Sequence, residues 1–183
     1  MTAEQGATLN VKVILGSTRP NRVSEKVIPW LLEQIKKNEA IKVEVLDLRE
    51  HNLPFFDEPI SPSMVKDGNY PKAEVKRWAE KIGSADAYIV VAPEYDHGVP
   101  AVLKNAFDYI YYEWNRKAVG FVSYGSVAGA RSVEHLRQIA VELQMASVRT
   151  AVHIPAPWTL VDGNGDFKPG SLDQFEDAAK GML

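Results

Sequence analysis

Short apolar runs separated by helical patterns constrain the fold of this chain more than any other feature. Four runs predict buried strands, and a weaker fifth candidate follows; they are Val11–Leu15, Lys42–Leu46, Ala87–Ala92, Ala118–Val122 and Val148–Ile154. Two of the runs are almost continuously apolar rather than alternating, which is typical of a sheet covered on both faces. The chain therefore favours a sheet buried between two layers of helices.

Helical stripes lie between these runs. The first places Val23, Val27, Leu31 and Ile35 four residues apart, and further stripes run through residues 102–110, 133–143, Pro71–Ile82 and Leu172–Met182. Strands that alternate with helices imply right-handed crossovers and a parallel sheet. We expect an α/β three-layer sandwich of the flavodoxin-like kind, with a five-stranded parallel sheet in the order 2-1-3-4-5. Its ligand crevice would lie at the carboxyl ends of strands 1, 3 and 4.

Two segments depart from the regular pattern. Pro29 interrupts the first helical stripe, and a proline past the first turn should bend the helix or delay its start, so we expect an irregular opening turn. Residues Arg49–Asn69 form a long, proline-rich stretch without a period. Such a loop in a compact domain is usually functional or mobile.

Composition limits the classes of protein. The 183 residues suit a single domain, residues 1–183, and the net charge of −3 gives no nucleic-acid footprint. There is no cysteine, which excludes thiol chemistry and disulfides. The polar start, Met1–Asn10, does not resemble a signal peptide, and no apolar run approaches membrane-spanning length. We expect a cytoplasmic protein without metal ligands, nucleic-acid partners or membrane association.

The first loop, Gly16–Ser24, directly follows the first predicted strand. Gly16 permits a tight exit from the strand, Ser17, Thr18 and Ser24 carry hydroxyl groups, and Arg19 carries a permanent charge. The loop lacks the further glycines of G-x-G-x-x-G and the Gly-Lys-Ser/Thr of a P-loop. A monophosphate held by side chains therefore fits better than a pyrophosphate. The alternative is an ordinary turn with Ser24 as helix N-cap.

Two more loops fall at the same expected edge. The second, residues 93–100, offers Glu94, Tyr95 and Asp96 to the crevice, and the third, residues 123–131, is rich in small residues that allow a flat ligand close to the backbone. Each has a plain alternative, a polar turn or a glycine-containing β–α turn, and His97 alone is usually a surface residue. The sequence has no Gly-x-Ser-x-Gly elbow with a nucleophilic serine, so it does not indicate a hydrolase. One loop suited to a phosphate and two loops that can form the walls of a slot suggest a flat heterocycle with a single phosphate, which describes FMN.

The residues that carry a family resemblance are Gly16-Ser17-Thr18-Arg19 with Ser24, Pro93-Glu94-Tyr95-Asp96, and Val102-Leu103-Lys104-Asn105-Ala106-Phe107-Asp108. They resemble the NADPH-dependent FMN reductases, a flavodoxin-like family that includes quinone, azo-dye and chromate reductases. The resemblance covers about residues 11–154. It implies that FMN is bound by Ser17, Thr18, Arg19, Asn21, Val23, Ser24, Pro93, Glu94, Tyr95, Asp96, Ser123, Gly125 and Ser126.

The resemblance also implies a mechanism. A nicotinamide, NADPH or NADH, would pass hydride to flavin N5, and a quinone, free flavin, azo compound or metal oxyanion would then accept the electrons, so no catalytic side chain is expected. Arg22, Arg116 and Arg131 are unranked candidates for a 2′-phosphate contact. Asp96 stands where the family usually has Asn, and Tyr109 where it usually has Trp. The alternatives are a flavodoxin-type electron carrier, disfavoured by the charge of −3 and by Arg19, and a regulatory protein without cofactor.

Surplus aromatic residues suggest assembly. Tyr109, Tyr111, Tyr112 and Trp114 cluster after the third helical stripe, and aromatic residues are enriched at interfaces. The resemblance implies a homodimer or homotetramer with the flavin near the subunit boundary. The alternative is that these rings fold back over the domain edge beneath the Arg49–Asn69 loop.

Overall fold

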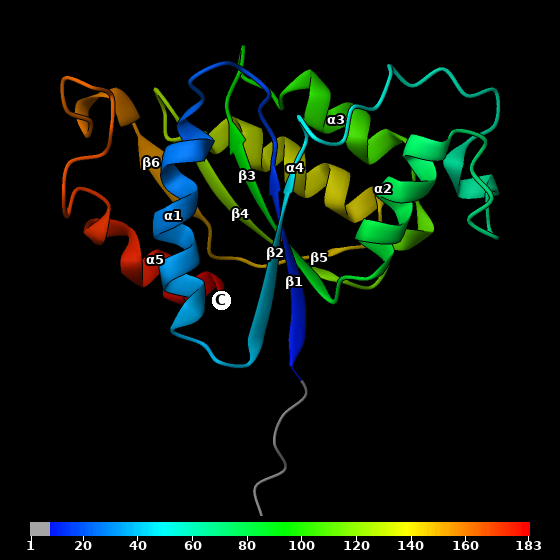
Figure 1. Ribbon diagram of the computed structural model, residues 1–183, viewed down its shortest axis with the longest axis horizontal. Helices are drawn as coiled ribbons and strands as arrows, with labels where there is room; N and C mark the ends of the chain where they lie inside the picture. The colour runs from blue at the N-terminus through cyan, green and yellow to red at the C-terminus, as the bar shows by residue number, and fades with distance from the viewer. Residues whose placement is uncertain (1–7) are drawn as a thin grey trace, which may run out of the picture.

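The computed structural model describes residues 8–183, which form strands and helices in strict alternation over most of the chain (Figure 1). The first seven residues of Met1–Asn10, on which part of the signal-peptide prediction rests, lie outside the described residues. The strands are β1 (Leu9–Leu15), β2 (Ile41–Asp47), β3 (Ala87–Pro93), β4 (Ala118–Gly125), β5 (Ala146–Ser147) and β6 (Val152–Pro155). The helices are α1 (Val23–Lys36), α2 (Ala73–Gly83), α3 (Ala101–Asp108), α4 (Ala130–Glu142) and α5 (Glu176–Met182).

The sheet has the predicted order, β2-β1-β3-β4-β5, and all of its pairings are parallel. The fifth strand differs from the prediction, because the run Val148–Ile154 is not one strand. β5 pairs with the start of β4 and β6 with its end. Between them, Arg137 of α4 donates hydrogen bonds to the carbonyls of Val148 and Arg149, at 2.9 and 2.8 Å, so these carbonyls turn toward α4.

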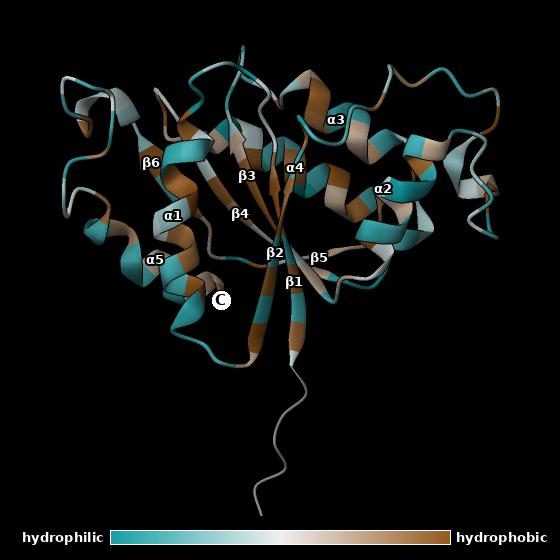
Figure 2. Ribbon diagram, in the orientation of Figure 1, coloured by the Kyte–Doolittle hydropathy of each residue, from teal (hydrophilic) through white to brown (hydrophobic). Residues whose placement is uncertain are grey.

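Helices cover both faces of the sheet, as the nearly continuous apolar runs predict. α1 and α5 lie together on one face, and α2, α3 and α4 cover the other (Figure 1). Figure 2 shows the hydrophobic colour along the middle of the sheet and the polar colour on the outer surfaces of the helices. Val13, Val90 and Val122, one from each of three strands, are 0% exposed. Their burial from both sides explains why these strands lack an alternating pattern.

Helix α1 begins at Val23 and continues through Pro29, so Pro29 does not delay its start, the second of the two predicted effects. Its N-cap is Arg22 rather than Ser24, which also removes the ordinary-turn interpretation of Ser24. Pro29 lies on the exposed side of the helix, whereas Val27 and Leu31 are fully buried. An interior proline costs about 3 kcal/mol. The burial of the apolar stripe holds the helix despite this cost.

The aromatic cluster after α3 is mostly internal, so it does not support the interface interpretation. Tyr109 is 1% exposed and Trp114 is 0% exposed, with the Trp114 ring packed edge-on against Tyr88 at 4.9 Å between centroids. The hydroxyls of Tyr109 and Tyr112 donate to the carbonyls of Phe55 and Ser63, at 3.0 and 2.9 Å. These rings pack beneath the Arg49–Asn69 loop, as the alternative interpretation has it, and they anchor that loop to the domain.

Candidate functional site

Three loops meet at the carboxyl edge of the sheet, and hydrogen bonds join them in pairs. The Ser17 and Tyr95 hydroxyls lie 2.8 Å apart and connect the first loop to the second. The backbone N–H of Ser24 donates to the Tyr124 hydroxyl at 3.2 Å and connects the first loop to β4. The site predicted at the ends of strands 1, 3 and 4 is therefore a single continuous surface.

Gly16 is required at the exit from β1 because the chain has no room for a side chain there. A Cβ atom at this position would lie 2.7 Å from the Leu103 Cδ2 atom and 3.3 Å from the Val91 carbonyl oxygen. The Gly16 N–H also donates to that carbonyl at 2.9 Å. The glycine thus serves a close approach of the loop to β3 and α3.

Two buried serines give the first loop its chemical character. Ser17 and Ser24 are both 0% exposed, and the Ser24 Oγ atom is buried with no hydrogen-bond partner. Helix α1 begins beside it, and its N-cap residue, Arg22, makes no side-chain capping hydrogen bond. A buried hydroxyl without a partner is costly. An anion bound at the N-terminus of the helix would accept a hydrogen bond from this hydroxyl.

The arginines of the first loop have different surroundings. Arg19 is exposed, and its guanidinium lies 5.5 Å from the centre of the Tyr95 ring. Arg22 is buried and forms an ion pair with Asp47 at the end of β2. The hydrogen bond to Asp47 raises the pKa of Arg22 further above its usual value. Arg22 is therefore committed inside the protein, and Arg19 is the cation that faces the site.

The second loop is a tight hairpin turn. Tyr95 and Gly98 exchange two backbone hydrogen bonds, at 3.1 and 2.8 Å, and Asp96 and His97 between them have positive φ angles of 47° and 65°. This is the pattern of a type I′ turn, which favours Asn or Asp at its first central position. Asp96 and an Asn thus suit the same backbone, and both Asp96 and His97 are exposed.

Glu94 faces away from the crevice and toward the third loop. Its side chain is 5% exposed and accepts hydrogen bonds from the backbone N–H of Arg131 at 3.1 Å and from Arg131 Nε at 2.6 Å. Burial opposes ionisation of Glu94, but the bonds from Arg131 outweigh it and lower its pKa. Glu94 is therefore the carboxylate that caps the N-terminus of α4.

Ser123 is also turned inward. Its Oγ donates to the carbonyl of Ala128 at 2.8 Å and lies 3.0 Å from His153 Nδ1, which closes the third loop on itself. Gly129 has a φ of 70°, and a Cβ there would lie 2.8 Å from the Tyr124 nitrogen. Ser126 is exposed at the tip of the loop and Gly125 is partly exposed. The loop offers its backbone and Ser126, rather than Ser123, to a ligand.

A cavity of about 360 Å³ lies beside the first loop. Thr18, Arg19 and Tyr95 form its polar side, and apolar residues of the segments 53–55 and 100–102 form the rest. Asn105 holds the outer wall: its Oδ1 accepts from the Phe56 N–H at 2.8 Å and its Nδ2 donates to the Pro54 carbonyl at 2.7 Å. Phe55, on this wall, is 80% exposed.

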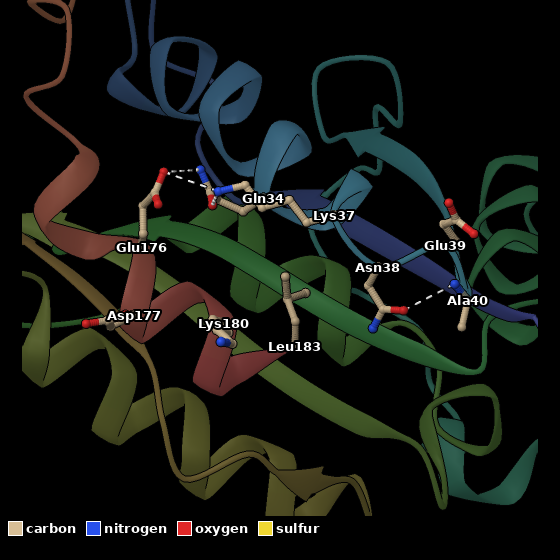
Figure 3. A pocket seen from close by; sticks show the side chains of 9 residues that line it. All are labelled: Gln34, Lys37, Asn38, Glu39, Ala40, Glu176, Asp177, Lys180 and Leu183. Carbon is tan, nitrogen blue, oxygen red and sulfur yellow. Dashed lines mark hydrogen bonds and ion pairs between the residues drawn. The ribbon is translucent and has the colours of Figure 1, made fainter.

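Two other cavities lie apart from this one. Asn21 and Val23 line a cavity of about 450 Å³ on the other side of the first loop, together with Trp158. A larger cavity, about 860 Å³, lies between the end of α1 and helix α5 (Figure 3). Its Gln34 and Lys37 side chains are bonded to Glu176 at 3.2 and 3.3 Å. These polar groups satisfy one another, and nothing in that cavity resembles the first loop.

The structure thus brings some of the predicted FMN-binding residues together at one edge of the sheet. Ser17, Thr18, Arg19, Ser24 and Tyr95 lie together on or beside the first loop, and the backbones of Pro93, Asp96, Gly125 and Ser126 border the same edge. The side chains of Glu94 and Ser123 are used internally, and Asn21 and Val23 face another cavity. The prediction did not include Tyr124, Asn105, Asp47 and Arg49, which hold these loops in place.

The part of the chain that the structure describes contains no helix long and apolar enough to cross a membrane. Within residues 8–183 no three His, Cys, Asp or Glu side chains are grouped as metal ligands would be.

Comparison with known proteins places this site in a family context. The sequence model of the family described as NADPH-dependent FMN reductase matches residues 9–159. An NAD(P)H-dependent FMN reductase of Schizosaccharomyces pombe is 38% identical over 149 residues, covering 81% of this chain and 72% of the relative. A quinone reductase of Escherichia coli is 32% identical, covering 74% and 71%.

The fold agrees with solved structures of a flavoenzyme and an azoreductase. FerB, an NAD(P)H:(acceptor) oxidoreductase from Paracoccus denitrificans, superposes with a TM-score of 0.68 over 95% of this chain and 98% of that protein, at 19% sequence identity. The azoreductase AzrA superposes with a TM-score of 0.63 at 16% identity. At these identities the likeness concerns the fold alone.

Proposed function

Because the chain belongs to the family of NADPH-dependent FMN reductases, we propose that the loops described above serve an NAD(P)H-dependent reductase with FMN as its cofactor. Its acceptors include a quinone, the substrate class named for relatives such as the E. coli quinone reductase. When bound, FMN supplies the redox chemistry between the nicotinamide and the acceptor. The residues of this chain supply binding, orientation and exclusion of water.

The single observation that carries the cofactor assignment is the buried, unpartnered hydroxyl of Ser24 at the uncapped start of α1. A phosphate accepts hydrogen bonds from hydroxyl groups and from the N–H groups at a helix start, and the Ser17 hydroxyl and the Thr18 side chain add donors beside Ser24. Arg19 supplies the positive charge for a phosphate that carries close to two negative charges. The residues present therefore fit the phosphate of FMN.

The isoalloxazine ring is assigned to the other two loops. The support is the tight turn at Tyr95–Gly98 and the small third loop, both of which expose backbone at the same sheet edge. In this assignment Pro93, Glu94, Asp96, Ser123 and Gly125 act through the backbone, and Tyr95 and Ser126 also contribute side chains. Asn21 and Val23 act as backbone supports of the first loop. We assign no side chain a proton-transfer role.

The nicotinamide and the acceptor would share the cavity of about 360 Å³ beside Arg19 and Tyr95. Its apolar walls suit a flat ring and exclude water from it. A flavodoxin-type electron carrier is disfavoured, because the named relatives are reductases.

A second copy of the chain would lie against the exposed residues Phe55, Ile60 and Met64, which are 80%, 58% and 70% exposed, and on this ground we propose a homodimer or homotetramer. A single domain over residues 1–183 and a cytoplasmic location stay predictions.

The test is a spectrum followed by turnover. The purified protein supplied with FMN and then desalted should stay yellow, and it should oxidise NADPH or NADH steadily when a quinone such as menadione is added. A colourless protein after desalting contradicts the cofactor assignment. A yellow protein that shows no steady oxidation of either nicotinamide supports the electron-carrier alternative.

A further inference from the structure

The outer side of the first loop is held by two arginines that the phosphate assignment does not use. Arg22 Nη1 donates to the carbonyl of Ser17, Arg49 Nε donates to the carbonyl of Thr18 at 3.2 Å, and Arg49 Nη2 donates to the carbonyl of Arg19. Three successive carbonyls are thus bound by guanidinium groups. In a trans peptide the C=O and the following N–H point in opposite directions. The Thr18 and Arg19 N–H groups therefore point away from both arginines.

The sheet fixes these arginines in turn. Asp47 ends β2 and lies in register with Leu15, the last residue of β1. Its carboxylate accepts from Arg22 at 2.7 Å and from the backbone N–H of Arg49 at 2.9 Å. Glu25, in the first turn of α1, contacts both guanidinium groups, at 3.0 Å in the case of Arg22. The loop carbonyls are thereby tied to the end of β2 and to α1 at once.

This network is electrically balanced, since two arginines face two carboxylates. Burial opposes ionisation of Asp47, but hydrogen bonds from Arg22 and from the Arg49 backbone outweigh it and hold the pKa of Asp47 below its usual range. The formal charges of the two arginines and the two carboxylates cancel. Arg19, which has no hydrogen bond from its guanidinium to a carboxylate among the described residues, remains as the net positive charge of the loop.

We propose that Arg22 and Arg49 form an arginine clamp, a pair of positioning residues that turns the carbonyls of residues 17–19 outward so that the N–H and hydroxyl groups of the loop face a phosphate. The clamp acts through geometry and does not touch the phosphate. This inference rests on the proposed function, because it concerns the same loop. The clamp goes beyond the proposed function because it assigns selectivity for the phosphate to residues outside the binding surface.

The test compares two flavins that differ only in the phosphate. Dissociation constants for FMN and riboflavin are measured by quenching of flavin fluorescence in the wild type, Arg49→Ala and Arg22→Lys. Loss of the clamp should weaken FMN binding about tenfold, as expected for lost charge-assisted positioning, and change riboflavin binding by less than about twofold. Arg49 is partly exposed, so Arg49→Ala keeps the test valid if the buried Arg22→Lys variant does not fold. Arg77→Ala, an exposed arginine on α2, is the matched control.

The dependence of FMN binding on salt concentration separates residues that position the loop from residues that attract the phosphate by charge. Attraction between an exposed arginine and a phosphate weakens with ionic strength, whereas a neutral, partly buried network is screened much less. The FMN dissociation constant of Arg19→Ala should therefore respond less to salt than that of the wild type. Arg49→Lys keeps the network neutral but loses the guanidinium fork that binds two carbonyls, so it should bind FMN more weakly and keep the wild-type salt dependence.

Three outcomes overturn the clamp. FMN affinity could be unchanged in Arg49→Ala and Arg22→Lys, FMN and riboflavin affinity could fall by the same factor, or Arg49→Lys could bind FMN as tightly as the wild type. The first result would show that the contacts do not affect binding. The second would show that they support the pocket as a whole, and the third that the charge of residue 49, rather than its paired hydrogen bonds, favours FMN. A wild type that binds neither flavin contradicts the proposed function itself, which distinguishes the two failures.

Discussion

At the scale of single residues, the first loop combines a buried polar group without a partner and an exposed charge. Ser24 Oγ is buried and unsatisfied, and Arg19 is exposed over the Tyr95 ring. The arrangement of Ser24 is not favoured by folding alone, because an unpaired buried hydroxyl costs about 1–3 kcal/mol. A residue kept in this condition is better explained by binding than by stability.

The variant Ser24→Ala separates a role of Ser24 in flavin binding from a role in protein stability. Removal of an unpaired hydroxyl relieves its desolvation, so the free energy of unfolding of the protein without flavin should stay equal or rise by up to about 1 kcal/mol. FMN binding should weaken about tenfold because a hydrogen bond to a charged group is lost. Urea unfolding and flavin fluorescence measure the two effects. A variant that loses stability but keeps its FMN affinity would give Ser24 a structural role instead.

Asp96→Asn tests how the second loop is used. Asp96 has a φ of 47°, which Asn tolerates equally, so the thermal midpoint should not fall. FMN should stay bound, and if the loop contributes only its backbone, the absorption spectrum and the flavin midpoint potential should match the wild type. A shifted potential would instead show that the charge of the Asp96 side chain reaches the flavin.

At the scale of elements, the loops are held by side chains from neighbouring strands and helices. Glu94 at the end of β3 caps α4, Asn105 on α3 holds the segment 54–56, and Asp47 at the end of β2 holds Arg22. Each of these side chains lies at the carboxyl end of a strand or on the helix beside it. The shape of the site is therefore set by the sheet, although the binding residues lie on loops.

Glu94→Ala removes the cap of α4 and leaves the Arg131 backbone N–H without its acceptor. Loss of a capping carboxylate costs about 1–2 kcal/mol, so the urea midpoint should fall. Because Glu94 joins the second and third loops, flavin should also dissociate faster from the variant. Glu134→Ala, an exposed acidic residue on the same helix, is the control and should leave both values unchanged.

The pairing of β1 with β2 depends on pH through Glu44. This residue lies opposite Lys12 and contacts Lys81, and hydrogen bonds from Lys12 first and Lys81 second lower its pKa to about 2. A carboxylate with a lowered pKa in the folded state stabilises the protein above its unfolded pKa, about 4.3. That contribution is lost as the pH falls toward 2. The difference in free energy of unfolding between the wild type and Glu44→Gln should thus be largest near pH 7 and shrink below pH 4; a difference that grows on acidification contradicts this.

At the scale of the whole molecule, the sequence predicts the architecture well because the architecture follows from hydrophobic periodicity. The order β2-β1-β3-β4-β5 and the two helical layers agree with the structure. The family could also be predicted from the sequence, since Gly16–Ser24 and Pro93–Asp96 are continuous segments and both lie within residues 9–159, which the family model matches.

Contacts between distant segments could not be predicted in the same way. The bonds of Arg22 and Arg49 to carbonyls 17–19 depend on how β2 ends beside the first loop, which periodicity does not specify. The inward rotation of Glu94 and of the aromatic rings Tyr109 and Trp114 depends on packing partners far along the chain. The interruption between β5 and β6 lies where Arg137 of α4 donates to the carbonyls of Val148 and Arg149, a contact that the apolar run does not predict.

The central claim is that the first loop grips the phosphate of a flavin, and the most direct measurement compares FMN with riboflavin on the unmodified protein. Several charge-assisted hydrogen bonds at a helix N-terminus should make FMN bind at least about a hundredfold more tightly than riboflavin at low salt. Equal affinity for the two flavins would show that the loop does not recognise phosphate.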